Sequence, residues 1–155
     1  MTDNTSRQPD HVGATPGGDN PMFVARLASG LVFLHDAQFL PGWCVLLAVP
    51  RVARLEDLED APRDRFLADM GVLGRAVAAA MAPRRINYAI YGNAMPLLHA
   101  HVIPRYDWEP ADRVTQPVWT YPAAQWQNAP ADTDPADRVK TKNAIRAALA
   151  PVARY

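Results

Sequence analysis

One long helical stripe lies between short strand-like runs, and this arrangement most limits how the chain can fold. Apolar residues recur at spacings of four, three and four: Phe66, Met70, Leu73 and Val77. This spacing predicts an amphipathic helix over residues 62–82. Asp60 and Pro62 suit its cap and first turn, and Pro83 ends it. Such a helix must cover its apolar face with a sheet or with other helices.

Strand-like segments precede the helix. Residues 23–34 are rich in Val, Leu and Phe around Ser29-Gly30, which predicts two short strands joined by a tight turn. Residues 43–49 form an apolar run of strand length, bounded by Pro41-Gly42 and Pro50. This run predicts a buried central strand.

Two further strands are predicted after the helix, at residues 86–91 and 97–103, and their short connection favours antiparallel pairing. Seven of the fifteen prolines lie from Pro104 onward, which predicts a mostly irregular tail. The tail ends in a short helix over residues 135–150, capped by Asp134 or Thr133. The fold class is therefore α+β: an antiparallel sheet with one long helix packed on it and an irregular, Pro-rich C-terminal tail.

The chain of 155 residues suits a single domain. We expect a disordered segment at 1–20, a core at 21–110, and a tail at 111–155 that belongs to the same domain. Sixteen basic residues balance sixteen acidic ones, which argues against a general nucleic-acid binder. No apolar run reaches the roughly 18 residues of a membrane span, and Cys44 has no second cysteine to pair with. We expect a cytoplasmic protein.

A His-x-His pair carries the chemistry of the sequence. On a strand, Leu97, His99 and His101 share one face, and the Cα atoms of the two histidines lie roughly 7 Å apart. A neutral imidazole is a competent nucleophile, and a second one beside it can donate a hydrogen bond to a phosphate oxygen. Asn93 lies in the turn just before this strand, where an amide and backbone N–H groups can cradle an anion.

The spacing alone leaves other interpretations open. The histidines can be ordinary residues of a half-buried strand. They can also form a zinc pair, which needs a third ligand from His11, His35 or Cys44.

A wider stretch resembles a known family. Residues 91–106 read Tyr-Gly-Asn-Ala-Met-Pro-Leu-Leu-His-Ala-His-Val-Ile-Pro-Arg-Tyr. They resemble the signature of the histidine triad (HIT) superfamily, His-φ-His-φ-His-φ-φ with φ apolar, often followed by Pro-Arg. Residues 31–49 resemble the nucleotide-binding strand pair of that family. The resemblance covers roughly residues 22–110 and implies a HIT-like fold of the bacterial single-domain branch.

The resemblance implies a role for each matching residue. His99 is the nucleophile that attacks an α-phosphate and forms a covalent nucleotidyl-histidine, and His101 hydrogen-bonds the phosphate or leaving-group oxygen. Asp36 binds the ribose hydroxyls, and Asn93 contacts phosphate or orients the nucleophile. The implied activity is a nucleotide hydrolase or nucleotidyl transferase acting on a nucleoside phosphate ester, a dinucleoside polyphosphate such as a diadenosine polyphosphate, or a phosphoramidate. It implies neither cofactor nor bound metal, and a homodimer through the long helix and a neighbouring strand.

The chain departs from the family pattern at two positions. Leu97 replaces the first histidine of the signature, and Trp43 stands where a histidine often follows Pro-Gly. Two alternatives follow: a nucleotide-binding protein with little or no catalytic activity, and a metal-dependent hydrolase that uses His99 and His101. His35 is interpreted as structural, and Trp43, Trp108 and Trp119 as core or interface residues.

Overall fold

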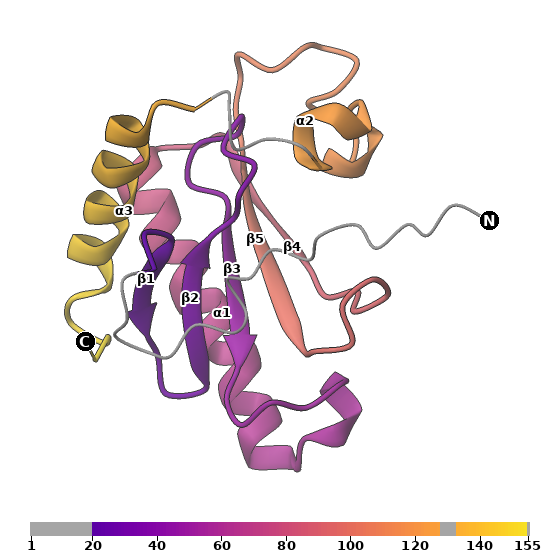
Figure 1. The fold of residues 1–155 in the computed structure, drawn as a ribbon, viewed down its shortest axis with the longest axis vertical. Coiled ribbons are helices and arrows are strands. Elements are labelled where there is room, and N and C mark those ends of the chain that lie inside the picture. The colour runs from indigo at the N-terminus through magenta and orange to yellow at the C-terminus, as the bar shows by residue number, and fades with distance from the viewer. Residues whose placement is uncertain (1–19, 128–132, 155) are drawn as a thin grey trace.

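Five strands form one antiparallel sheet in the computed structural model, which describes residues 20–127 and 133–154 (Figure 1). The strands are β1 (Phe23–Arg26), β2 (Gly30–Leu34), β3 (Cys44–Ala48), β4 (Arg85–Ala89) and β5 (His99–Arg105). Their order across the sheet is β1-β2-β3-β5-β4, so the predicted central strand β3 is central. The predicted disordered segment 1–20 lies outside the described residues, apart from Asn20.

The predicted hairpin and the predicted late strand pair are both confirmed. β1 pairs with β2 and β4 pairs with β5, in each case antiparallel. Gly30 is required where β2 begins, because a Cβ there would lie 2.2 Å from the carbonyl oxygen of Leu47 on β3. β5 begins at His99, two residues later than predicted, and it continues to Arg105.

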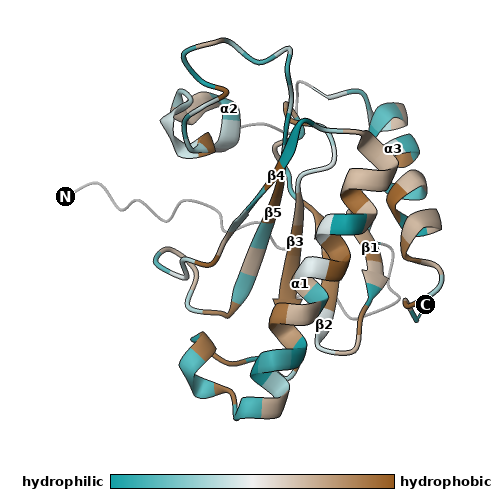
Figure 2. Ribbon diagram, turned by 180° about the vertical axis from the view of Figure 1, so that it is seen from behind, coloured by the Kyte–Doolittle hydropathy of each residue, from teal (hydrophilic) through white to brown (hydrophobic). Residues whose placement is uncertain are grey.

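Helices α1 (Asp60–Met81) and α3 (Pro135–Leu149) cover one face of the sheet, with α3 packed beside α1 and against β1 (Figure 1). Seen from the helix side, β3 is hydrophobic while α1 carries both hydrophobic and polar positions (Figure 2). Short helical turns complete the chain: η2 (Leu55–Asp57), η3 (Val118–Thr120) and α2 (Ala123–Gln127). None of the described helices is long and apolar enough to cross a membrane.

Two expectations about the helices need correction. The cap of α1 is Glu59 rather than Asp60, because the helix begins two residues earlier than predicted. α3 is a core element rather than the end of an irregular tail, since Ile145 and Leu149 are fully buried. The predicted cap of α3 is confirmed, because the Asp134 carboxylate accepts the N–H of Ala136 at 2.8 Å.

The face of the sheet away from the helices carries the histidines. Strand alternation turns Val32, Leu46, Ala100 and Val102 toward the helices, where they join the main core. Leu31, Phe33 and Leu47, at alternate positions of β2 and β3, point the other way and form a separate cluster. Cys44 belongs to the main core, on the side opposite the histidines, so it cannot be their third metal ligand.

Candidate active site

β5 presents His99 and His101 side by side on the open face of the sheet. The strand pairs His99 with Leu47 and His101 with Val45 on β3, so both imidazoles lie over the centre of the sheet. Their ring centroids are 5.1 Å apart. His99 is 7% exposed and His101 is 8% exposed, so both rings are largely shielded from water. The expectation that they share a face is confirmed.

The backbone fixes the tautomer of His99. Its Nδ1 lies 2.6 Å from the carbonyl oxygen of Leu97. A carbonyl oxygen only accepts hydrogen bonds, so Nδ1 carries the proton and the lone pair of a neutral ring lies on Nε2. The Leu97 side chain packs against the cluster of Leu31, Phe33 and Leu47. The backbone carbonyl at position 97 therefore orients the ring of His99, although the leucine side chain cannot hydrogen-bond.

His101 has the opposite tautomer. The indole Nε1–H of Trp43 donates to Nδ1 of His101 at 3.2 Å, so the proton of the neutral ring lies on Nε2. Burial, together with the neighbouring His35 and His99, lowers the pKa of His101 to about 3. His101 is therefore a neutral hydrogen-bond donor at physiological pH.

His35, which the sequence offered only as a possible zinc ligand or a structural residue, lies against His101 in the structure. Its ring stacks on that of Trp43 with the ring centroids 4.0 Å apart, and its centroid lies 5.6 Å from that of His101. Its Nδ1 accepts the N–H of Ala37, and burial lowers its pKa to about 4. Strand alternation could have placed His35 on the same face as His101. Phe33 pairs with Val45, and Val45 pairs with His101, so these residues share one face of the sheet. His35 lies two residues after Phe33 and therefore points the same way.

The C-terminal tail closes one side of the histidine pair. Trp119 in η3 meets the ring of His101 edge-on at 5.4 Å and that of Trp43 at 5.6 Å. Trp43 and Trp119 are thus part of the site, whereas Trp108 is 62% exposed and stacks on Tyr106.

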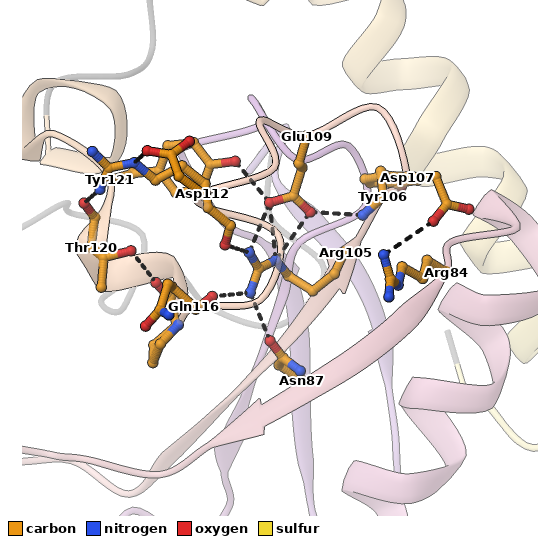
Figure 3. Close-up of polar contacts among 12 residues, drawn as sticks. Arg84, Asn87, Arg105, Tyr106, Asp107, Glu109, Asp112, Gln116, Thr120 and Tyr121 are labelled. Carbon is orange, nitrogen blue, oxygen red and sulfur yellow. Dashed lines mark hydrogen bonds and ion pairs between the residues drawn. The ribbon is translucent and has the colours of Figure 1, made fainter.

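A buried polar network, the Arg105–Glu109 network, anchors this tail (Figure 3). The Arg105 guanidinium and the Glu109 carboxylate approach to 2.8 Å, and both side chains are almost fully buried. Arg105 also donates to Asn87 and to backbone carbonyls of the tail, and the Tyr121 hydroxyl donates to Glu109 at 2.7 Å. Burial raises the pKa of Glu109, but its hydrogen bonds outweigh that effect, so the pKa is lowered.

The two other predicted site residues lie in loops. Asp36 is half-buried and follows His35 directly after β2, while Asn93 is exposed in the loop that leads into β5. A hollow of about 630 Å³ lies on the same sheet face, between β4 and the tail. Its lining includes Tyr91, Asn87 and Trp119 but neither histidine.

The described residues contain no group of three or more His, Cys, Asp or Glu side chains arranged to hold a metal ion. His35 approaches the histidine pair, but its Nδ1 is occupied by Ala37 and Nδ1 of His101 is occupied by Trp43. His11 lies outside the described residues.

No protein-family model matches the chain, and no curated protein matches it. Solved structures do. A histidine triad protein from Bradyrhizobium japonicum is 22% identical, with a TM-score of 0.68 over 81% of this chain and 87% of that one. One from Marinobacter aquaeolei VT8 is 22% identical, with a TM-score of 0.69 over 84% and 89%.

A third solved structure, a hypothetical histidine triad nucleotide-binding protein from Sulfolobus tokodaii, is 10% identical. Its TM-score is 0.63 over 84% of each chain. These likenesses extend over most of this chain, which folds as a five-stranded antiparallel sheet with helices. The chain therefore has the α+β fold of histidine triad proteins.

Proposed function

We propose that this protein is a nucleotide hydrolase or nucleotidyl transferase that acts at an α-phosphate through a covalent nucleotidyl-His99. The observation that carries the proposal is the 2.6 Å contact between Nδ1 of His99 and the carbonyl of Leu97. This contact directs the lone pair of a neutral imidazole to Nε2, which is what a nucleophilic histidine needs. His101 supports it as a neighbouring N–H donor for the phosphate oxygens.

The chemistry proceeds in two displacements. Nε2 of His99 forms a bond to the α-phosphorus while the bond from phosphorus to the leaving oxygen or nitrogen breaks, and the electron pair departs with the leaving group. Water, or another acceptor hydroxyl, then bonds to phosphorus, and the Nε2–phosphorus pair returns to His99. The attacking oxygen releases its proton to solvent, and a nucleoside monophosphate or its ester leaves.

The surroundings of His99 suit the rest of a nucleotide. Leu31, Phe33 and Leu47 form a buried apolar cluster on the histidine face of the sheet, and a nucleobase would pack against it once the covering side chains move aside. Asp36 is the proposed ligand of the ribose hydroxyls, and Asn93 is open to a phosphate from its loop. Because only 7% of His99 is exposed, a nucleotide must displace part of its cover to reach Nε2. The nucleotide-binding protein from Sulfolobus tokodaii shares the fold, which agrees with this proposal.

The test is a trapped intermediate. Incubation with diadenosine tetraphosphate, followed by an acid-free quench and intact-protein mass spectrometry, should show an added adenylate. His99→Ala should lose the adduct and lower the hydrolysis rate by about a thousandfold or more, with nucleotide affinity kept within several-fold. His35→Phe is the matched control, because it removes a nearby imidazole that has no covalent role. An adduct that persists in His99→Ala contradicts the proposal.

A second candidate is a nucleotide-binding protein with little turnover. The leucine side chain at position 97 and the low exposure of His99 favour it. Calorimetric titration with adenosine monophosphate, combined with the adduct measurement, separates the two. Binding with neither adduct nor product over hours favours the binding protein.

We also propose a homodimer through α1 and β4. β4 is an edge strand of the sheet, and Tyr88 on it is 46% exposed. Light scattering coupled to size-exclusion chromatography measures the mass. A monomer at all concentrations contradicts this part of the proposal.

A further inference from the structure

The ring of His101 is enclosed by four other rings. Trp43 donates to its Nδ1, His35 approaches from the end of β2, His99 lies beside it on β5, and Trp119 covers it from η3. The centroids of these rings lie 5.1 to 5.8 Å from that of His101. Trp43 itself is fully buried and stacked on His35, so its indole has little freedom to turn away.

This arrangement gives His101 one hydrogen-bonding role. An indole N–H only donates, so Nδ1 of His101 must stay unprotonated to accept it. Protonation of His101 would require breaking that contact in a water-poor site whose titratable neighbours, His35 and His99, carry no negative charge. His101 can therefore donate a hydrogen bond from Nε2–H, but as a neutral ring it cannot transfer a proton to a leaving group.

We infer that Trp43 is a positioning residue that holds His101 as a neutral Nε2–H donor, and that the site consequently favours substrates whose leaving groups need no proton. The inference rests on the proposed function. A phosphate or polyphosphate leaves as an anion, because the pKa of its conjugate acid is near 6. An amine or an alcohol leaves as a much stronger base and must be protonated as its bond to phosphorus breaks. Phosphate anhydrides are thus the substrate class, rather than phosphoramidates or simple esters.

The electron balance of this step needs no acid. The bond from Nε2 of His99 to the α-phosphorus forms, and the bond from phosphorus to the bridging oxygen breaks. The electron pair remains on the departing phosphate. The Nε2–H of His101 hydrogen-bonds that oxygen or a non-bridging oxygen and keeps its proton throughout.

The first test does not depend on turnover. Nitrogen-15 NMR of histidine-labelled protein distinguishes protonated from unprotonated ring nitrogens. We expect His101 to show only the Nε2–H tautomer and to remain neutral down to pH 5. Trp43→Phe keeps a ring on His35 but removes the N–H, and it should give a mixture of tautomers. Trp119→Phe is the matched control, since it alters another ring against His101 and should leave the tautomer unchanged. A protonated or Nδ1–H form of His101 in the wild type overturns the inference, even if Trp43→Phe fails to fold.

The second test compares leaving groups. The kcat/KM for diadenosine tetraphosphate should exceed that for an adenosine phosphoramidate by at least about tenfold. Trp43→Phe should reduce this ratio of kcat/KM values roughly fivefold. Equal rates in the wild type overturn the substrate class. If neither substrate is cleaved and His99→Ala has the same rates as the wild type, the proposed function is wrong, and the substrate class that depends on it is wrong too. The NMR result still decides the role of Trp43.

Discussion

His101 and Arg105 lie on the same strand, on the same face, and both are buried, yet they differ in how burial is accommodated. At the histidine end, His35 and His101 become neutral because burial lowers the pKa of each. At the arginine end, the charges of Arg105 and Glu109 remain and are paired. A buried ionisable group must either become neutral or have its charge paired.

The two solutions leave different chemistry behind. Arg105 donates hydrogen bonds to Glu109, Asn87 and tail carbonyls, so it stabilises the tail and has few N–H groups free to bind a ligand. His99 and His101 each use Nδ1 for a protein contact and keep Nε2 for another partner. The charged network therefore holds the tail in place, while the histidine end keeps ring nitrogens for the proposed chemistry.

The largest stability effect is expected from breaking the Arg105–Glu109 network. Glu109→Gln leaves the Arg105 charge buried without its partner and should lower the free energy of unfolding by about 3 kcal/mol. Urea denaturation measures this change. Tyr121→Phe removes one hydrogen bond to Glu109 but keeps the ion pair, so it should cost only about 1–2 kcal/mol. A loss below about 1 kcal/mol in Glu109→Gln contradicts the distinction between the two ends.

As the pH falls, the histidine end and the arginine end should lose their contributions to folding stability in different pH ranges. His35 and His101 have folded pKa values below the ordinary value of 6.5, so the unfolded chain takes up their protons first as the pH falls. Their contribution is complete above pH 6.5 and declines below it, by up to about 1.4 kcal/mol per pH unit for each histidine. The lowered pKa of Glu109 contributes above its ordinary value of 4.5, and that contribution is lost only below it.

Urea denaturation at a series of pH values checks both windows. His35→Phe should roughly halve the slope between pH 6 and pH 5, and Glu109→Gln should leave that slope unchanged while flattening the curve below pH 4.5. An unchanged slope in His35→Phe would show that His35 does not remain neutral in the folded protein.

The smallest effect is expected at Asp36, which follows His35 at the histidine end. Asp36→Ala should raise KM for a dinucleoside polyphosphate about tenfold through loss of the ribose hydrogen bonds, with a smaller change in kcat. Asp107→Asn is the control, because Asp107 is an exposed carboxylate at the arginine end, paired with Arg84. If both variants have the wild-type KM, the ribose role of Asp36 is wrong.

The sequence alone predicted the elements and the face shared by His99 and His101. Helix and strand periods are local properties, so Phe66, Leu73 and Val77 could be assigned to one helix face before any contact was known. The same period of two placed both histidines together. The end of β4, the start of β5 and the cap of α1 moved by one or two residues, because element ends depend on neighbouring contacts.

Only the tertiary structure decided how each histidine is used. The donor that fixes His101 comes from Trp43, which lies 58 residues away in the chain, and no local pattern encodes that contact. The same holds for the stacking of His35, the burial of Cys44 on the opposite face and the Glu109 anchor of the tail. Proton position and charge depend on which groups surround a side chain, and packing brings those groups together from separate strands and loops.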